Sequence, residues 1–460
     1  MKKYIYNITK AVGLALVLIL VLSSCDKWID TEINIDPDAP ADVSMNLMLP
    51  AIEQAVGFNM AGNDMVRSTA LWAQQFDGVD RQSLTQTKYQ YTSADVNNLW
   101  NTMYTSIFMN AIVFIDKAEN TEGKESPHNA GVAKVLTATT LGIATDVFGD
   151  MPFSDAFKGS EGNLKPMFDT QEIIYATIFS TLDAAIADLG SATNAIDIEG
   201  DVVYGGDADA WKKAAYSVKA RHLLQLSGVN GNAAYTDALA AVANGFSSNA
   251  DDFEVPWEAA NPNPLWQFMD ERTDIRMGST FVNLLKSNDD PRLPFYAAKD
   301  GDGEYTGSDP GSVNEDASKL GNYIAGKDAS SIMMSYAELK FIEAEALFVT
   351  GGDAQTAYEA AVTASVLKVT GVANTAWLAG NIIGIPVTLE LIMTQKYIAT
   401  YGTNQPYADY RRTGFPDIMV DPIHAVLPEM PTRFPYSQEE LTFNGANVPI
   451  VSISDKLWWN

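Results

Sequence analysis

The sequence predicts a mainly α-helical fold, in which helix pairs repeat to form a scaffold and long loops form an irregular second lobe. Apolar residues recur with helical spacing over most of the chain, whereas strand-like stretches such as 448–453 are few and short. Segments 210–244 and 332–369 each combine a helix, a glycine turn and a second, alanine-rich helix. Helix–turn–helix units of about 34 residues with small residues at the crossing are typical of tetratricopeptide-like repeats.

The first 24 residues are predicted to be a lipoprotein signal peptide, which ends before the only cysteine of the chain, Cys25. Three lysines precede twelve apolar or glycine residues at 11–22, a run too short for a stable transmembrane helix. The stretch Leu22-Ser23-Ser24-Cys25 resembles the lipobox of bacterial lipoproteins, whose cysteine becomes the lipid-bearing N-terminus. An ordinary signal peptide followed by an unrelated thiol is the alternative.

Residues 25–42 are predicted to form a lipid-anchored tether, because Asp36-Pro37-Asp38-Ala39-Pro40 disfavours regular structure. Residues 43–460 are predicted to form a single domain. More than one acyl chain gives stable membrane anchoring, so the body is expected to lie in water beside a membrane.

Helical periodicity dominates the domain. Helices are predicted at about 47–77, 99–118, 130–147, 172–189, 208–227, 232–244, 334–349, 353–369 and 388–402. The pattern Asp169-x-x-Glu172 predicts the N-terminal cap of the helix at 172–189.

Long connections separate these helices, at 78–94, 149–169, 190–207, 245–273, 288–331 and 413–450. Connections of this length are usually functional or pack as lobes of their own. Segments 245–331 and 413–450 are therefore predicted to form a loop-rich ligand lobe.

Composition excludes several classes of function. The formal charge is −28 and the pI about 4.3, so a nucleic-acid backbone would be repelled. With three histidines and no cysteine left after lipidation, the chain shows neither a zinc motif nor a thiol nucleophile, and a Gly-x-Ser-x-Gly elbow is absent. His222 is predicted to be a satisfied helix-packing residue. The chain is therefore predicted not to be an enzyme, and no cofactor is expected.

One acidic loop is a weak candidate for calcium. Asp300, Asp302 and Glu304 alternate as in the opening of a calcium loop, but Tyr305 and Gly311 stand where an EF-hand needs glycine and glutamate. A turn-rich, solvated loop is the favoured interpretation, and a structural calcium ion is the alternative.

Aromatic residues among amides and guanidiniums in the loops indicate ligand binding. Such rings stack on the C–H face of a sugar while polar neighbours satisfy its hydroxyls, and peptide-binding surfaces use the same ingredients. The candidate ligand residues are Asp77, Arg81, Tyr89, Trp257, Asn263, Trp266 and Arg272.

Several motifs, in chain order, resemble one family of proteins. They are 34–40 (NIDPDAP), 141–156 (LGIATDVFGDMPFSDA), 206–213 (GDADAWKK) with 219–221 (KAR), 290–293 (DPRL), 335–346 (SYAELKFIEAEA), 407–416 (YADYRRTGFP) and Trp458-Trp459. Together these are similar to the SusD/RagB family of outer-membrane nutrient-binding lipoproteins, in its SusD-like branch. Arg411 and Arg412 in this series are predicted to be charge-paired packing residues.

The resemblance implies about four tetratricopeptide-like helix pairs and a loop-rich second lobe. It also implies a cell-surface lipoprotein of the outer membrane, which captures oligosaccharides and passes them to a SusC-type TonB-dependent transporter. A peptide-binding subunit of the same kind of complex is the alternative, and a surface glycosidase or adhesin a more remote one.

Overall fold

The computed structural model describes residues 43–460. The predicted signal peptide, Cys25 and the predicted tether lie outside the described residues, so their assignments stay predictions. Residues 45–460 belong to one structural unit, and the elements below all lie within it.

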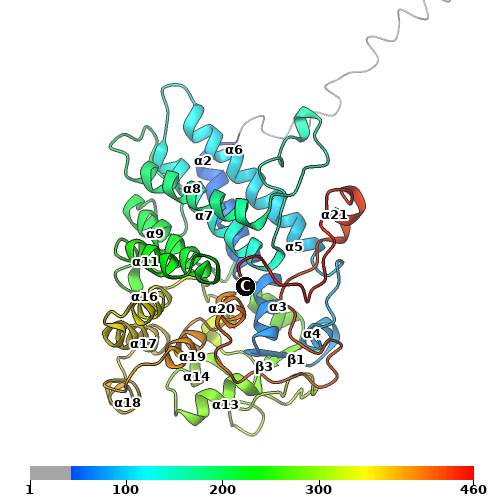
Figure 1. The fold of residues 1–460 in the computed structure, drawn as a ribbon, viewed down its shortest axis with the longest axis vertical. Coiled ribbons are helices and arrows are strands. Elements are labelled where there is room, and N and C mark those ends of the chain that lie inside the picture. Colours follow the sequence, from blue (N-terminus) through cyan, green and yellow to red (C-terminus); the bar gives the residue numbers. More distant parts are fainter. Residues whose placement is uncertain (1–42) are drawn as a thin grey trace, which may run out of the picture. The chain divides into compact units, whose positions relative to one another are not determined.

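A series of helices forms the scaffold, and in chain order they run from the top of Figure 1 down its left side. It comprises α2 (Met45–Met60), α6 (Met109–Asn120), α7 (Pro127–Phe148), α8 (Gln171–Leu189), α9 (Ala208–Gln225), α11 (Asn232–Val242), α16 (Tyr336–Thr350), α17 (Ala354–Thr370) and α19 (Leu389–Ala399). From α6 to α17 each of these helices packs on the next, and α19 packs on α16 and α17. The predicted helical scaffold is confirmed, and the two units predicted from sequence are α9 with α11 and α16 with α17.

Local sequence signals explain where these helices begin and end. The Asp207 carboxylate accepts hydrogen bonds from the backbone N–H groups of Asp209 and Ala210 at the start of α9, and Ser335 accepts one from Glu338 at the start of α16. Gly351 ends α16 in the left-handed conformation, with φ of 81°. The cap predicted at Asp169 is wrong by one residue, because the Thr170 hydroxyl accepts the hydrogen bond that begins α8.

Helix α7 is the central helix of the scaffold. Its length and composition would allow it to cross a membrane, yet 94% of its most apolar window is buried inside the protein, as in a core helix. Gly142 permits the close approach of α9, because a Cβ at this position would lie 2.2 Å from the His222 ring. His222 does pack in the core as predicted, but neither ring nitrogen has a hydrogen-bond partner in the described chain, so it is not satisfied. Burial lowers its pKa to about 3, which keeps the ring neutral.

Three sequence predictions of element extent need correction. The helix predicted over 47–77 divides into α2 and α3 (Asp64–Trp72), because Gly62 lies against Pro264 where no side chain fits. The helix predicted over 99–118 consists of α5 (Asn97–Thr102), the π-helix η1 (Met103–Phe108) and α6. Segment 448–453 forms no strand, and Pro449 within it lacks the N–H that a sheet ladder needs.

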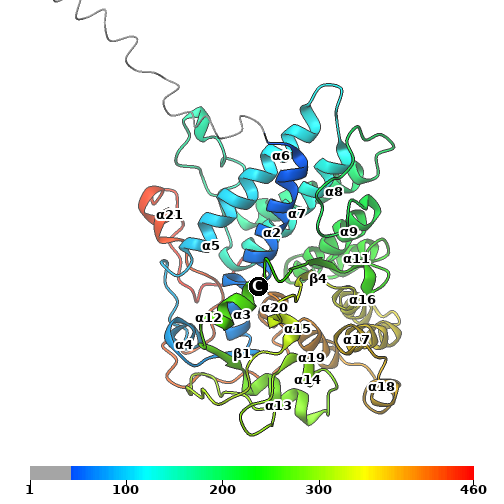
Figure 2. The same cartoon turned by 180° about the vertical axis from the view of Figure 1, so that it is seen from behind.

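The second lobe is built from short elements. They are β1 (Phe76–Gly78), α4 (Arg81–Thr87), β2 (Phe253–Val255), α12 (Pro264–Glu271), β3 (Ile275–Met277), α13 (Ser279–Ser287), α14 (Leu293–Tyr296), α15 (Asn322–Ala325) and β4 (Ser331–Met334). Strand β1 pairs antiparallel with β3, and β2 with β4. Figure 2 shows α12 beside α15 in the view from behind. Smaller elements complete the described chain: η2 (Gly159–Glu161), α10 (Ser227–Asn230), η3 (Asn249–Asp251), α18 (Thr375–Asn381), α20 (Gln405–Thr413) and α21 (Gln438–Phe443).

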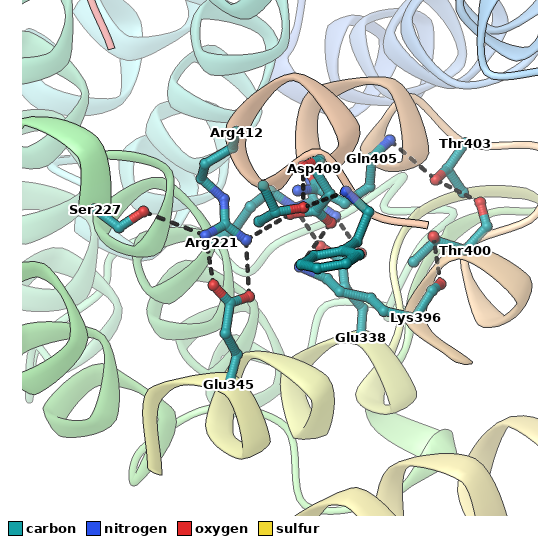
Figure 3. A network of polar contacts seen from close by, with 12 residues as sticks. Arg221, Ser227, Glu338, Glu345, Lys396, Thr400, Thr403, Gln405, Asp409 and Arg412 are labelled. Carbon is teal, nitrogen blue, oxygen red and sulfur yellow. Dashed lines mark hydrogen bonds and ion pairs between the residues drawn. The ribbon is translucent and has the colours of Figure 1, made fainter. Parts of the chain in front are cut away.

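A buried network of charges joins α20 to the scaffold (Figure 3). Arg412 on α20 pairs with Glu345 on α16 and, at 2.9 Å, with Asp409. Lys396 on α19 lies 2.8 Å from the other Asp409 oxygen. The charge-paired role predicted for Arg412 is confirmed.

Its neighbour Arg411 has a different environment. The guanidinium donates hydrogen bonds to the backbone carbonyls of Thr432 and Asp146, both at 2.7 Å, and lies over the Tyr407 ring. Arg411 is therefore a packing residue held by carbonyl groups rather than by a carboxylate.

Candidate functional site

Segment 417–430, which follows α20, divides a large open groove of the second lobe into two clefts. The first, here named the α13 cleft, has a volume of about 720 Å³ and lies between α13 and this segment. The second, here named the tyrosine cleft, has a volume of about 360 Å³ and is lined by residues that include Tyr89, Tyr410 and Met430. Val420 and Asp421 line both clefts, so the two clefts adjoin along this segment and are together named the groove. Concave sites of this volume are typical of ligand-binding proteins.

A glutamine from a distant part of the chain holds this segment in place. The Gln74 side-chain amide donates to the carbonyl oxygen of Val420, and its own oxygen accepts the Val420 N–H at 3.1 Å. The same oxygen accepts a hydrogen bond from the Thr280 hydroxyl at 2.7 Å. Gln74 therefore connects segment 417–430 to α13 across the floor of the groove.

Two backbone contacts complete the attachment of the segment. The N–H of Ile423 donates to the Pro310 carbonyl at 2.8 Å, and that of Val426 to the Lys88 carbonyl at 2.9 Å. Asp77 fixes the turn around Pro310 that makes the first contact, because its carboxylate accepts hydrogen bonds from the Ser308 hydroxyl and from the Gly311 N–H. Burial raises the pKa of Asp77 to about 6, against the opposing effect of these hydrogen bonds.

Four of the eight described non-glycine residues with positive φ are associated with this segment. Among the described non-glycine residues with positive φ, Gln74 (54°), Tyr89 (64°) and His424 (61°) either belong to the segment or line or support its clefts. Val313 (61°) ends the turn that contacts Ile423. A bulky residue with positive φ costs free energy, and such residues cluster where a binding surface is held in one conformation.

The two walls of the α13 cleft differ in chemistry. Asn283 and Ser287 lie exposed on α13, whereas the rest of the lining presents Val420 and Ile423, with 52% and 47% of their surface exposed, together with the exposed carboxylates of Asp309 and Asp421. Val426, 58% exposed, continues the apolar side of the segment. The cleft can thus hydrogen-bond one side of a ligand and contact an apolar face on its other side.

The tyrosine cleft offers two phenol groups. Burial raises the pKa of Tyr89, and the nearby carboxylate of Asp421 raises it further. Burial also raises the pKa of Tyr410, with smaller effects from Asp417 and Asp421. Both hydroxyls therefore stay protonated at neutral pH and can donate as well as accept hydrogen bonds.

The structure brings only part of the predicted ligand set to this groove. Tyr89 lines the tyrosine cleft, although only 4% of its surface is exposed, and Asp77 lies beneath the turn that holds Ile423. Trp257 and Asn263 are 5% and 2% exposed. Their side chains serve internal contacts, since the Trp257 indole donates to Ser331 and Asn263 caps α12.

The remaining predicted ligand residues lie on a separate surface, here named the α12 surface. Trp266 is partly exposed beside Lys327, whose ammonium lies 5.1 Å from the ring centre. Arg272 donates to Gln82 at 3.0 Å, and Arg81 pairs with the buried Asp274. The two arginines are thus brought together near the end of α12, and neither lines either cleft.

The acidic loop at 300–305, the weak calcium candidate, folds around its own carboxylate. Asp300 accepts hydrogen bonds from the N–H groups of Asp302 and Glu304, at 3.0 and 2.9 Å, and from the Thr306 hydroxyl at 2.8 Å. Within residues 43–460, no three histidine, cysteine or acidic side chains come together as a metal site would require. The geometry is that of a self-closed turn, and the calcium alternative has no cluster to support it.

Sequence reasoning missed Gln74, Tyr410 and the polar face of α13. Segment 417–430 lies within the 413–450 connection, which the sequence assigns to the ligand lobe. Nothing in the local sequence indicated that Gln74 and α13 would meet that segment, because these contacts join residues more than 130 positions apart.

Comparison with known proteins places this architecture among related chains. The profile of the SusD-like family, described as "Starch-binding associating with outer membrane", matches residues 37–437. A SusD/RagB family protein from Bacteroides thetaiotaomicron is 26% identical, with a TM-score of 0.76 over 91% of this chain and 99% of that one. The sequence has no significant match among curated proteins.

Two further solved structures share the fold at lower identity. A chitin-binding SusD homolog from Flavobacterium johnsoniae is 22% identical, with a TM-score of 0.77 over 90% of this chain and 98% of that one. A SusD homolog from Bacteroides fragilis is 24% identical, with a TM-score of 0.75 over 91% and 99%. The predicted family resemblance is thereby confirmed.

Proposed function

This chain belongs to the SusD-like family, and we propose that it captures oligosaccharides in the groove formed by the α13 and tyrosine clefts. The observation that carries the proposal is the amphipathic α13 cleft. A sugar ring has an apolar C–H face and a rim of hydroxyls, which match the Val420–Ile423 wall and the Asn283–Ser287 wall. The family description as starch-binding supports the same class of ligand.

The family consists of outer-membrane-associated binding proteins rather than enzymes. On this basis we infer that the protein is anchored in the outer membrane through lipid on Cys25 and faces the cell exterior. It would hand its oligosaccharide to a SusC-type TonB-dependent transporter without cleaving it. Copurification of such a transporter with the lipidated protein tests the partnership, and a Cys25→Ser variant should be released from the membrane.

The glycan-binding test is a thermal-shift screen of neutral oligosaccharides, followed by calorimetry. A ligand present at 100 times its Kd stabilises the folded state by about 2.7 kcal/mol, which is readily detected. Asn283→Ala should weaken binding about tenfold without changing the melting temperature of the free protein, because this side chain is exposed. Trp266→Ala is the matched variant on the α12 surface. If Trp266→Ala abolishes binding and Asn283→Ala does not, the ligand lies on the α12 surface instead.

A peptide ligand is the second candidate. The exposed side chains of Val420, Ile423 and Val426 would contact apolar peptide side chains as well as sugar rings. A peptide array run beside the glycan panel separates the two. Saturable peptide binding that Asn283→Ala weakens, without any response to glycans, would replace the first proposal by this one.

A further inference from the structure

We propose that the α13 cleft selects uncharged or amine-bearing sugars and rejects acidic ones. The proposal deepens the proposed function and rests on it. Among residues 43–460, Asp309 and Asp421 are the only charged residues that line this cleft, and both are exposed. Neither carboxylate has a hydrogen-bond partner among residues 43–460, so both are free to meet a ligand.

These two carboxylates discriminate between ligands because they can only accept hydrogen bonds. An ionised carboxylate accepts hydrogen bonds and donates none, so it binds a sugar hydroxyl or an ammonium group. A uronate or sulfate presents only further acceptors and negative charge. Asn283 and Ser287 on the opposite side carry no positive charge that would offset this repulsion.

Charges elsewhere in the groove confine the selection to the α13 cleft. The tyrosine cleft is lined by Lys456 as well as by Asp421 and Glu429, so the lysine offsets one of its two carboxylates. Arg411 also lines that cleft, but its guanidinium is already engaged by the Thr432 and Asp146 carbonyls. An oligosaccharide that spans both clefts therefore meets its strongest charge restriction beside α13.

The size of the effect follows from the Coulomb interaction in water. A carboxylate placed about 4 Å from a ligand carboxylate weakens binding about fivefold, since the site is open to solvent. Two such contacts weaken it roughly 25-fold at low salt. The same two groups leave a neutral ring unaffected or improve its binding through hydroxyl donors. Added salt should reduce the discrimination because the cleft is open to ions.

The experiment compares ligands that differ in charge on one backbone. Hexagalacturonate and its neutral methyl ester form the acidic pair, and glucosamine hexamer and its neutral N-acetylated form, chitohexaose, form the amine pair. Affinities are measured by calorimetry at low salt for the wild type, for Asp309→Asn with Asp421→Asn, and for the control Asp237→Asn. Asp237 is exposed on α11, remote from the groove in sequence and absent from both clefts.

The expected result is that the wild type binds the neutral methyl ester at least tenfold more tightly than hexagalacturonate, and binds the glucosamine hexamer at least as tightly as chitohexaose. The double variant should remove most of that difference, whereas Asp237→Asn should preserve it. Equal binding of hexagalacturonate and its methyl ester by the wild type, or discrimination unchanged in the double variant, overturns the inference while the proposed function stands. Absence of binding to every oligosaccharide of the screen and of this panel overturns the proposed function itself.

Discussion

Glu53 on α2 is predicted to be protonated in the folded protein at neutral pH. Its side chain is completely buried, and one carboxyl oxygen accepts the Val202 N–H at 2.8 Å. The Asp201 carboxylate, which accepts hydrogen bonds from several N–H groups including the Trp211 indole, lies close enough to act on Glu53, whose second oxygen has no hydrogen-bond partner within residues 43–460. Burial, and then the neighbouring Asp201 carboxylate, raises the pKa of Glu53 to about 10. A protonated Glu53 avoids both the burial of a charge and the repulsion from Asp201.

The sign of the pH dependence follows from this shift. In the unfolded chain Glu53 titrates near 4.5, so between that pH and about 10 the folded state holds one proton more than the unfolded state. The contribution of Glu53 to stability is fully present below the unfolded pKa and is lost as pH rises through the folded pKa. The free energy of unfolding therefore falls by up to about 1.4 kcal/mol per pH unit, or about 4 kcal/mol between pH 6 and 9.

Glu53→Gln tests this reasoning, because the amide keeps both contacts without a titrating proton. Its oxygen can accept from Val202 and its NH₂ group can donate to Asp201. Urea unfolding at pH 6, 7, 8 and 9 gives the slope for each protein. Glu53→Gln should lose most of the pH dependence, while Glu122→Gln, at an exposed loop position, should match the wild type.

Other buried acids do not confound the comparison. The pKa of Asp146 is raised to about 7, but that residue is present in every variant and its contribution cancels in the difference of slopes. Identical slopes for the wild type and Glu53→Gln would show that Glu53 is ionised in the folded state and would refute the argument.

Four further predictions follow from the contacts described above. Gln74→Ala should weaken ligand binding more than tenfold by releasing segment 417–430, and a calorimetric affinity equal to wild type would contradict this role. Gly311→Ala should lower the free energy of unfolding by about 1–2 kcal/mol, since φ is 78° and a Cβ would lie 2.6 Å from the Ile423 carbonyl oxygen. Hydrogen exchange at 420–426 should become faster in the same variant. Gly142→Ala should cost about 1–3 kcal/mol in urea unfolding through its contact with His222, and an unchanged midpoint would show that α7 and α9 can separate freely. Arg412→Met should lower the free energy of unfolding, measured with urea, by about 3–5 kcal/mol, because Glu345 would be left buried without its partner. Stability equal to that of the wild type would mean that Glu345 becomes protonated with little loss of free energy.

Local sequence was sufficient for most of the scaffold. Helical periodicity and the glycine at position 351 depend on residues within one or two turns, so the α9–α11 and α16–α17 units could be predicted without knowledge of their neighbours. The break between α2 and α3 could not be predicted in this way, because Gly62 is confined by Pro264, some 200 positions away. The strand expected at 448–453 does not form, although a local signal against it was available, because Pro449 lacks the N–H that a sheet ladder needs.

The candidate ligand residues show more clearly the difference between what local sequence predicts and what only tertiary packing determines. Residue chemistry alone made Asp77, Trp257 and Asn263 attractive, yet all three are buried and bonded to groups far along the chain. Burial depends on which segments pack together, and a loop sequence does not report that. Tyr89 does line the groove, but its neighbours Gln74 and Tyr410 could be identified only from the tertiary structure.

By itself, the sequence determined the family, the helical scaffold and the lobe in which to look for a ligand, because periodicity, caps and ordered motifs are properties of local chain segments. Only the tertiary structure decided that 417–430 is fastened by Gln74 between two clefts, and that Asp309 and Asp421 face the same ligand space. The physical reason is that a groove is a surface shared by distant segments. Its shape and charge exist only after the backbone hydrogen bonds and buried ion pairs have brought those segments together.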